Sequence, residues 1–457
     1  MADLKKVFRD PIYNLISFDK KEDEPILKII NTAEFQRLRR IRQLGLSSYT
    51  YPTAVHDRFS HSLGVTYIVG VLFDSLNTPD SIDVTSPTGD EIKLTGKQLR
   101  LLIQLAGLLH DIGHGPFSHA FEKITDVNHE EMSKRIILNK EGNIYQILTS
   151  IEDETLAKYS PNWIVEIITG TFEPIWAREL ISSQLDADRI DYLLRDAYMC
   201  GVNYASFDIK WLFQNIEIGK IENEGNRLGL IINGKKGIHA VEAFIVSRYH
   251  MYEQVYFHKT TRGFEIITQK IFERLKSLLS KTEIENKLFF IDDHLLSFLE
   301  DNNNLDAYLG LDDFCLYTHF NRWTTCDDEI LSILCKSLIM RQPYKMFKEV
   351  ENDSLMEYDT RSKIDNYFKE KGKEGNYFYF EDKYRNVAYK DDYLLGKSNS
   401  ENASHIWLKV SGGKLKEFAE ASPIVQSLKN KELLKRRGYI HRDYYKDINR
   451  ILNQKIK

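Results

Sequence analysis

The sequence predicts a mainly α fold, with a helical core, small β-hairpin elements and a mixed α/β C-terminal part. Apolar residues recur at helical spacing through most of the first 280 residues, whereas strand-like alternation is confined to short stretches. Hydrophobic residues make up 42% of the 457 positions, which is enough to bury a sizeable core. A chain of this length forms two or three domains, or one large helical body with appendages.

The expected helices follow from apolar periodicity and from start and stop residues. Pro25 suits the first turn of a helix and Gly45 suits the position after its end, so one helix is expected between them. Lys97–His110 is apolar almost all round, as in a central buried helix. The complete set of expected helices is Pro25–Leu44, Phe59–Leu76, Lys97–His110, Ser182–Tyr198, Ala240–Leu279, Leu295–Leu309, Asp327–Met340 and a basic Leu428–Arg436.

Strands and loops are predicted from alternation and from turn residues. Asn77–Thr95 is rich in Pro, Ser, Asp and Gly, and is expected to be a loop. Asn233-Gly234 lies among alternating residues, so a hairpin is expected over Gly229–Gly237. Tyr377–Phe380 and His405–Val410 have the composition of strands.

A division into two parts is expected near residue 275. Residues 1–275 carry the helical core, and residues 276–457 form a helical and mixed region suited to assembly or regulation. The long helix expected before the division would tie the two parts together. The C-terminal part is harder to interpret because its periodic segments are short.

Composition excludes several classes of protein. Lys and Arg number 62 against 67 Asp and Glu, so no general cationic field points to nucleic acid or anionic membranes. The four cysteines are scattered without a Cys-x-x-Cys pair, which argues against a disulfide framework or zinc knuckle. The N-terminus lacks an apolar signal core, and no apolar run approaches the roughly 20 residues that a membrane span needs. We therefore expect a cytoplasmic protein.

The most informative stretch is His110–His119, which reads HDIGHGPFSH and directly follows the buried helix. His110 and Asp111 can offer a neutral nitrogen and an anionic oxygen to one metal ion. The glycines after them break the helix, so His114 can fold back over that point. A buried core histidine is the usual interpretation of any single one. A metal site is favoured because three histidines and an aspartate lie within ten residues.

Two other segments can supply further ligands. His61 lies in the first turn of a helix, with Arg58 three residues earlier on the same side. Asp188, Tyr192 and Asp196 are spaced at i, i+4 and i+8, so they share one helical face. Surface charge would explain the remaining acids of that helix, Asp186 and Asp191, but it would not explain the aligned face.

A further helix repeats this spacing. Arg248, Tyr252 and Tyr256 fall at i, i+4 and i+8, and Lys259 continues the row. Aromatic residues at helical spacing are often core residues, and that interpretation stays open for Tyr252. Arginine at one end of the row favours an anion-binding site.

Together these blocks resemble the HD-domain deoxynucleoside triphosphate (dNTP) triphosphohydrolases, in particular the type that pairs a SAM domain with the HD domain, here without the SAM domain. The resemblance covers roughly residues 5–270, and its blocks recur in order with matching neighbours. These blocks are Phe35-Gln36-Arg37-Leu38-Arg39, Gln43-Leu44-Gly45, His56-x-Arg58-Phe59-x-His61-Ser62-Leu63-Gly64-Val65, His110–His119, Leu185–Asp196 and Arg248–Lys259.

The resemblance implies a role for each matching residue. The implied ligands of a divalent cation (Mn, Fe, Zn or Mg) are His61, His110, Asp111 and Asp188. The residues implied to face the triphosphate are Arg58, His114, His119, His129, Arg189, Tyr192 and Arg248. His119 is implied as the proton donor, and Glu122 stands where its partner is usually aspartate. Gln43 and Asp196 would bind the sugar 3′-hydroxyl, while Leu44 and Tyr256 would crowd C2′.

The implied reaction is metal-dependent hydrolysis of a dNTP to a deoxynucleoside and inorganic triphosphate. A triphosphate carries about four negative charges, which a metal, guanidinium groups and imidazoles can neutralise. His114, His119 and His129 could instead bind a second ion, as in related phosphodiesterases. The alternatives are an HD-type phosphohydrolase acting on cyclic nucleotides, guanosine tetraphosphate or nucleic-acid ends, or a nucleotide sensor without catalysis.

The resemblance also implies an activating nucleotide bound between the subunits of a dimer or tetramer. The matching positions are Lys6, Val7, Asn31, Gln36 and Arg39. Asn31 stands where the guanine-selective relative has aspartate, and an amide presents one acceptor and one donor instead of two acceptors. We therefore expect an activator other than GTP, or none. A solvated basic face is the alternative interpretation of Arg37–Arg42.

Overall fold

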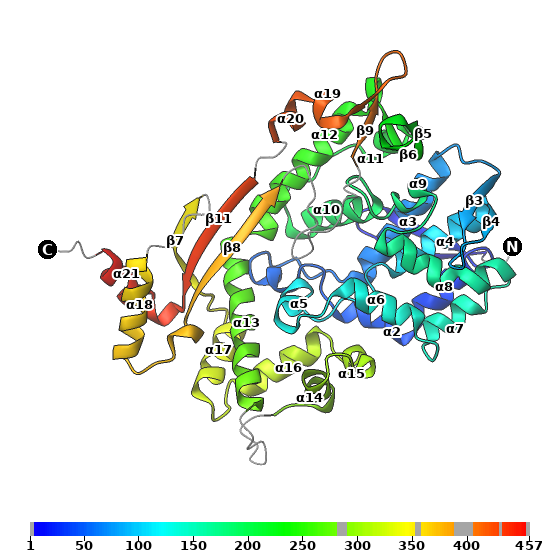
Figure 1. Cartoon of the computed structure of the whole chain (residues 1–457). Coiled ribbons are helices and arrows are strands. Elements are labelled where there is room, and N and C mark those ends of the chain that lie inside the picture. Colours follow the sequence, from blue (N-terminus) through cyan, green and yellow to red (C-terminus); the bar gives the residue numbers. More distant parts are fainter. Residues whose placement is uncertain (1–3, 281–289, 352–357, 388–404, 429–431, 454–457) are drawn as a thin grey trace.

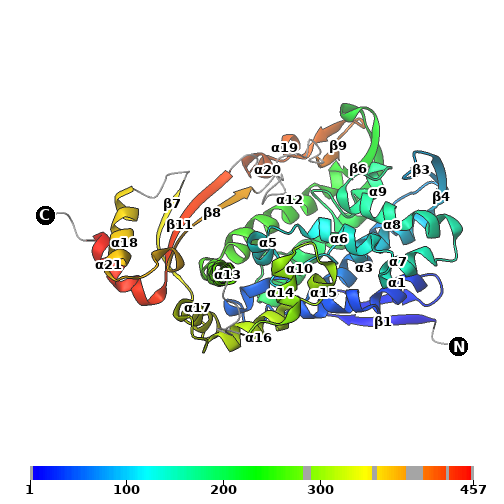
Figure 2. The same cartoon turned by 60° about the horizontal axis from the view of Figure 1, so that its bottom comes forward.

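The computed structural model describes residues 4–280, 290–351, 358–387, 405–428 and 432–453. It confirms a mainly α fold with small β elements (Figure 1). Helices dominate the N-terminal body, and a sheet built from late segments projects from it (Figure 2). Among the described helices, none combines the length and the apolarity needed to cross a bilayer.

Four helices form the centre of the N-terminal body: α3 (Arg58–Ser75), α4 (Gly96–Leu109), α8 (Glu154–Thr169) and α10 (Ala187–Cys200). Helices α3 and α10 pack against each other, and α4 lies against both α3 and α8. Each of the four starts at a capping residue whose side chain accepts a backbone N–H. The expected helices at Phe59–Leu76 and Lys97–His110 are confirmed, and Ser182–Tyr198 is helical from Ala187.

The remaining described helices lie in two stretches of the chain. In the N-terminal body they are α1 (Glu24–Ile30), α2 (Ala33–Gln36), α5 (His119–Thr125), α6 (His129–Leu138), α7 (Asn143–Thr149), α9 (Ile175–Arg178), α11 (Ile209–Phe213) and α12 (Gly234–Met251). Farther along they are α13 (Lys259–Leu279), α14 (Asp293–Glu300), α15 (Leu305–Leu309), α16 (Asp313–Trp323), α17 (Glu329–Ile339), α18 (Tyr358–Glu370), α19 (Phe418–Ala421), α20 (Pro423–Leu428) and α21 (Tyr445–Asn453). The helix expected at Asp327–Met340 is thus confirmed as α17.

The strands within the described ranges form four small sheets. Two are antiparallel hairpins, β1 (Lys5–Asp10) with β2 (Asn14–Asp19), and β3 (Ser81–Thr85) with β4 (Glu91–Thr95). The third has the order β10-β9-β6-β5, in which β6 and β9 are parallel. The fourth is antiparallel with the order β7-β11-β8. Their bounds are β5 (Ile216–Ile221), β6 (Arg227–Asn233), β7 (Lys345–Glu351), β8 (Tyr379–Val387), β9 (Trp407–Lys409), β10 (Leu415–Glu417) and β11 (Glu432–Ile440).

Three long helices predicted from the sequence are interrupted, because capping residues inside them start a new helix. Pro25–Leu44 was expected as one helix, but α1 ends near Asn31 and Thr32 caps α2, which is followed by a 3₁₀ turn over Arg37–Arg40. Ala240–Leu279 is divided by a π-helical turn at Tyr252–Tyr256 before His258 caps α13. Leu295–Leu309 is divided where Asn304 caps α15.

Three other expectations were wrong because strand partners lie far away or were not recognised. The loop expected at Asn77–Thr95 contains the β3–β4 hairpin. The hairpin expected at Gly229–Gly237 does not form, since β6 pairs with β5 and β9 and Gly234 begins α12. The basic helix expected at Leu428–Arg436 is instead largely strand β11, although residues 429–431 lie outside the described ranges. Strands β8 and β9 confirm those expected near Tyr377–Phe380 and His405–Val410.

A second hydrophobic cluster joins the C-terminal helices to the N-terminal body. Phe121 of α5 stacks on Phe298 and lies edge-on to Phe272, and Phe117 stacks on Phe320 of α16. Helix α13 runs across residue 275 and packs on α5 and α17. The division after residue 275 stays a prediction.

Candidate active site and metal centre

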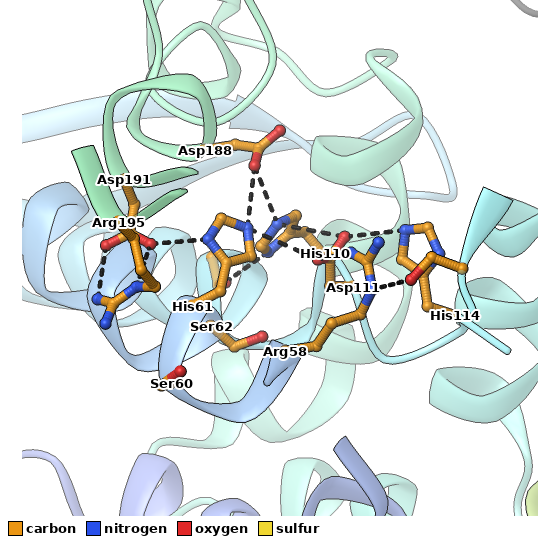
Figure 3. A network of polar contacts seen from close by, with 12 residues as sticks. Arg58, Ser60, His61, Ser62, His110, Asp111, His114, Asp188, Asp191 and Arg195 are labelled. Carbon is orange, nitrogen blue, oxygen red and sulfur yellow. Dashed lines mark hydrogen bonds and ion pairs between the residues drawn. The ribbon is translucent and has the colours of Figure 1, made fainter. Parts of the chain in front are cut away.

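Four side chains from three helices converge at the centre of the N-terminal body (Figure 3). His61 comes from the first turn of α3, His110 and Asp111 end α4, and Asp188 lies in the first turn of α10. The Asp188 Oδ1 atom is 3.1 Å from His61 Nε2 and 3.6 Å from His110 Nε2. The two Asp111 oxygens lie 3.6 Å from His61 Nε2 and 3.4 Å from His110 Nε2.

The hydrogen bonds of the two imidazoles favour metal binding. His110 Nδ1 lies 2.8 Å from the Gly107 carbonyl oxygen, and His61 Nδ1 lies 2.8 Å from Asp191 Oδ2, so each Nδ1 carries the hydrogen. Each Nε2 then presents a lone pair, and neither buried Nε2 atom has a hydrogen-bond partner among the described residues. His61, His110 and Asp188 lie close enough to hold one ion. A buried nitrogen pair flanked by carboxylates fits a divalent cation.

Charged neighbours keep the carboxyl groups ionised. Burial raises the pKa of Asp111, but Arg58 and nearby histidines bring the net pKa well below its usual range. Burial likewise raises the pKa of Asp188, while the imidazoles of His110 and His61, which lie within 3.6 Å of its Oδ1 atom, lower it below the ordinary value. The centre therefore offers anionic oxygens at neutral pH.

The loop after α4 is constrained beside the metal ligands. Arg58 is paired with Asp111, and its Nε donates to Ser118 Oγ at 2.9 Å. Phe117 and Ser118 have φ values of 53° and 54°, a left-handed conformation that is costly for residues other than glycine. Gly113 passes so close to α6 that an added Cβ would lie 2.2 Å from the His129 carbonyl oxygen.

A second group of side chains lies next to Asp111. His114 Nε2 is 3.3 Å from Asp111 Oδ1, and the rings of His114 and His129 stack with centroids 3.9 Å apart. Glu122 Oε1 is 2.5 Å from His129 Nδ1 and 3.6 Å from His114 Nδ1. These three residues could also hold an ion. His119 begins α5, and its side chain lies outside the described part of the structure.

The pKa values of this second group diverge. Burial and the Arg58 charge lower the pKa of His114 well below its ordinary value. Burial also acts to lower the pKa of His129, but the hydrogen bond and charge of Glu122 raise it overall. His129 is therefore suited to carry a proton at neutral pH, and His114 is suited to stay neutral.

A buried polar cluster surrounds Asp196. Its Oδ2 accepts from the Tyr256 hydroxyl at 2.8 Å, and its Oδ1 lies 2.7 Å from His56 Nε2. Gln43 joins them because its backbone N–H donates to the His56 carbonyl oxygen at 3.0 Å. The Gln43 Oε1 and His56 Nδ1 atoms are buried, and no residue in the described part of the chain forms a hydrogen bond with either atom. Leu44 is half-buried beside this segment.

Two predicted anion-binding arginines have different surroundings. Arg189 is buried and paired with Asp186, the residue that caps α10. Arg248 is buried near the end of α12, and its guanidinium carbon lies 5.5 Å from the Tyr252 ring centroid. Tyr192 and Tyr256 make a T-shaped contact at 6.1 Å, while Lys259 is exposed.

Several site residues were missed or misjudged from the sequence. Asp186 and Asp191 were interpreted as surface charges, but both are buried, because Asp186 pairs with Arg189 and Asp191 binds His61 and Arg195. His56 belonged to the block that begins His56-x-Arg58, but it was given no role from the sequence.

The residues implied to bind an activator lie on two segments. Lys6 and Val7 are exposed on β1. Asn31 lines an open surface pocket of about 600 Å³ together with Lys28, Asn143 and Gln146. Gln36 Oε1 accepts from Arg39 Nε at 2.9 Å. Arg37 is not part of a solvated face, because it is buried and donates to the Leu311 and His114 carbonyl oxygens.

The chain is similar to several known proteins. A model described as HD domain matches residues 58–196, and a model described as HD associated region matches residues 218–361. The uncharacterized protein YwfO of Bacillus subtilis is 35% identical over 453 residues, which cover 99% of this chain and 96% of that protein. The deoxynucleoside triphosphate triphosphohydrolase SAMHD1 homolog of Dictyostelium discoideum is 28% identical over 333 residues, covering 65% of this chain and 59% of that protein.

Solved structures agree with these sequence matches. The crystal structure of a phosphohydrolase from Bacteroides thetaiotaomicron has a TM-score of 0.75 at 28% identity, covering 96% of this chain and 100% of that chain. The matched HD domain spans the metal centre from Arg58 to Asp196. The resemblance predicted from the sequence is thereby confirmed. The chain belongs to the HD-domain phosphohydrolase family, and its relatives include the SAMHD1 proteins.

Proposed function

We propose that this protein hydrolyses dNTPs to deoxynucleosides and inorganic triphosphate. The observation that carries the proposal is the placement of Asp196 and its polar partners on the same helix as Asp188, two turns from the candidate metal centre. One helix thus presents a metal ligand and a hydroxyl-binding carboxylate to a single substrate. The name of the Dictyostelium relative supports the same substrate class.

The chemistry divides among the side chains around the centre. When bound, a divalent cation supplies Lewis acidity and lowers the pKa of water. We assign its ligands as His61, His110, Asp111 and Asp188. Arg58 faces the centre and can neutralise a phosphate, because guanidinium groups match phosphate oxygens in geometry and charge.

Proton transfer is assigned to the second group. Protonated His129, stabilised by Glu122, can neutralise charge on the phosphate chain or replenish a proton. We assign proton donation to the leaving 5′ oxygen to His119, which precedes Glu122 by three residues on α5. Neutral His114 can donate one hydrogen bond to a phosphate oxygen. Arg189, Tyr192 and Arg248 complete the proposed triphosphate site.

The sugar would be selected by a hydroxyl partner and a steric limit. Asp196 and Gln43 would bind the 3′-hydroxyl, while Leu44 and Tyr256 would crowd C2′ and exclude a 2′-hydroxyl. Because Asp196 is oriented from both sides by His56 and Tyr256, its position is defined before substrate arrives.

Leu44→Ala is expected to weaken discrimination against ribonucleotides by about 10-fold or more, since a few methylene groups in a pocket are worth 10- to 200-fold. The measurement is kcat/KM for dGTP relative to GTP. Leu228→Ala serves as the control, because Leu228 is an exposed leucine on β6. Unchanged selectivity in Leu44→Ala would place the steric limit elsewhere.

The reaction is tested by incubating the Mn²⁺-loaded protein with dATP, dCTP, dGTP, dTTP and GTP, alone and in pairs, and separating the products. Deoxynucleoside and triphosphate are expected, and His110→Ala should abolish both. Release of phosphate or of a nucleoside monophosphate would support another phosphohydrolase activity. No turnover in any mixture would support a nucleotide sensor.

The paired incubations also test regulation. We propose that a nucleotide other than GTP binds at Lys6, Val7, Asn31, Gln36 and Arg39 in a homodimer or homotetramer. The amide of Asn31 offers guanine one acceptor where a carboxylate would offer two. If GTP were the single nucleotide that accelerated dNTP hydrolysis, the proposal of an activator other than GTP would be contradicted.

A further inference from the structure

The turn of the N-terminal hairpin reaches into the interior of the protein. Asp10 Oδ1 accepts the backbone N–H groups of Ile12 and Tyr13 at 2.8 and 3.0 Å, which shapes the turn between β1 and β2. Its other oxygen accepts from Arg195 Nη1 at 2.7 Å. The Tyr13 hydroxyl donates to Asp191 Oδ1 at 2.9 Å. Two side chains of the hairpin thus contact the buried face of α10.

Arg195 and Asp191 form a two-pronged ion pair beneath this turn. Arg195 Nε and Nη2 donate to the two Asp191 oxygens at 2.8 and 2.9 Å. The side chains are 1% and 0% exposed, so water does not screen the pair. Gly64 of α3 permits this approach, because an added Cβ would lie 1.9 Å from Asp191 Oδ1.

The same carboxylate orients a metal ligand. Asp191 Oδ2 lies 2.8 Å from His61 Nδ1, on the side of the ring opposite the metal centre (Figure 3). A carboxylate partner fixes the tautomer and orientation of a metal-binding histidine and increases its basicity. A continuous series of hydrogen bonds therefore runs from Asp10 through Arg195 and Asp191 to His61.

We propose that Asp10 and Tyr13 are positioning residues that couple docking of the N-terminal hairpin to metal affinity. Asp10 balances the charge of Arg195, so Asp191 keeps its acceptor strength towards His61. If the turn moved away, Arg195 would keep Asp191 as its one anionic partner among the described residues, and it would withdraw electron density from the hydrogen bond between Asp191 and His61. The inference depends on the metal centre and does not depend on a dNTP being the substrate.

The coupling must act in both directions, because linkage between two equilibria is reciprocal. Metal binding is expected to favour the docked hairpin, and a ligand that favours the docked hairpin is expected to tighten metal binding. Lys6 and Val7 lie on β1, only a few residues from Asp10. Any molecule that binds this strand could therefore act on the metal centre without touching it.

The test is the Mn²⁺ affinity of the full chain carrying Asp10→Asn, measured by the electron paramagnetic resonance of free Mn²⁺. Loss of a direct partner of a metal-binding histidine costs about 10- to 100-fold in affinity. Asp10 reaches His61 only through Arg195 and Asp191, so Asp10→Asn is expected to weaken Mn²⁺ affinity by a smaller factor, about 3- to 10-fold. A second single variant, Tyr13→Phe, removes only a hydroxyl group. It is expected to change the Mn²⁺ affinity without unfolding the chain.

Asp19→Asn is the matched control. Asp19 Oδ1 also accepts two backbone N–H groups, from Lys21 and Glu22, but it lies at the other end of the hairpin. The Asp19→Asn variant should therefore have the same Mn²⁺ affinity as the wild type. Hydrogen exchange supplies a second measurement: Mn²⁺ should slow exchange across residues 5–19 in the wild type and less so in Asp10→Asn. Equal Mn²⁺ affinity in the Asp10 and Asp19 variants, or exchange that ignores Mn²⁺, would overturn the proposal.

Discussion

Asp188→Ala is expected to lose metal binding and hydrolysis together. Asp188 is the carboxylate that α10 contributes to the centre, and its Oδ1 lies within 3.6 Å of both ligand imidazoles. Loss of a residue that hydrogen-bonds to a metal ligand lowers metal affinity by up to roughly 100-fold. Loss of a ligand itself should lower metal affinity by more than that. Metal content after equilibrium dialysis, measured by mass spectrometry, and the rate of hydrolysis are the two measurements.

Two further variants make this result interpretable. Asp188→Asn keeps the volume of the side chain but lacks the charge, so it should resemble Asp188→Ala. Glu131→Ala removes an exposed carboxylate on α6 and should change neither measurement. Full metal content in Asp188→Ala would exclude Asp188 as a ligand and contradict the assigned centre.

Asp313→Ala is expected to destabilise the protein by about 3 kcal/mol. Asp313, in the first turn of α16, accepts the backbone N–H of Phe117 at 2.8 Å and that of Arg42 at 3.0 Å. Removing the buried carboxylate leaves both donors unsatisfied, at about 1–3 kcal/mol each. Because Phe117 belongs to the strained loop beside Arg58, kcat should also fall. Urea denaturation and steady-state kinetics measure the two effects.

The neighbouring residue provides a matched comparison. Asp312 caps α16 and pairs with the half-exposed Arg40, so Asp312→Ala should cost only about 1 kcal/mol, as expected for loss of a cap. If both variants lost the same stability and kept the same kcat, Asp313 would have no special role in the loop.

The charge of Asp313 makes the stability of the folded protein depend on pH. Burial raises its pKa to about 7, whereas an unfolded aspartate titrates near about 3.9. Between these values the folded state binds more protons, so the contribution of Asp313 to stability falls as pH rises from about 4 to about 7. Asp313→Asn should remove this slope, and an unchanged slope would assign it to another group.

Much of the candidate site could be predicted because its residues lie in short local patterns. His110 and Asp111 are adjacent, and Asp188 and Asp196 share one face of a single helix, so spacing alone brings each pair together. The buried α4 was likewise evident from continuous apolar sequence. Such features need no knowledge of distant segments.

The remainder depended on partners far apart in the chain. Asp191 resembles a surface acid until Arg195, His61 and Tyr13 surround it, and Tyr13 is 178 residues away. Asp313 carries no local signal for its bonds to Phe117 and Arg42. The strand β11 was mistaken for a basic helix because its partners β7 and β8 precede it by tens of residues. At these positions, contacts with distant segments determine the structure more strongly than local propensity does.

Hydrolysis of dGTP in H₂¹⁸O by the Mn²⁺-loaded protein tests the central claim most directly. Attack of water on the α-phosphorus breaks the bond between phosphorus and the 5′ oxygen. One ¹⁸O atom is therefore expected in inorganic triphosphate and none in deoxyguanosine, with no product from Asp188→Ala. Labelled phosphate or pyrophosphate, formed together with a deoxynucleotide, would contradict the proposed reaction.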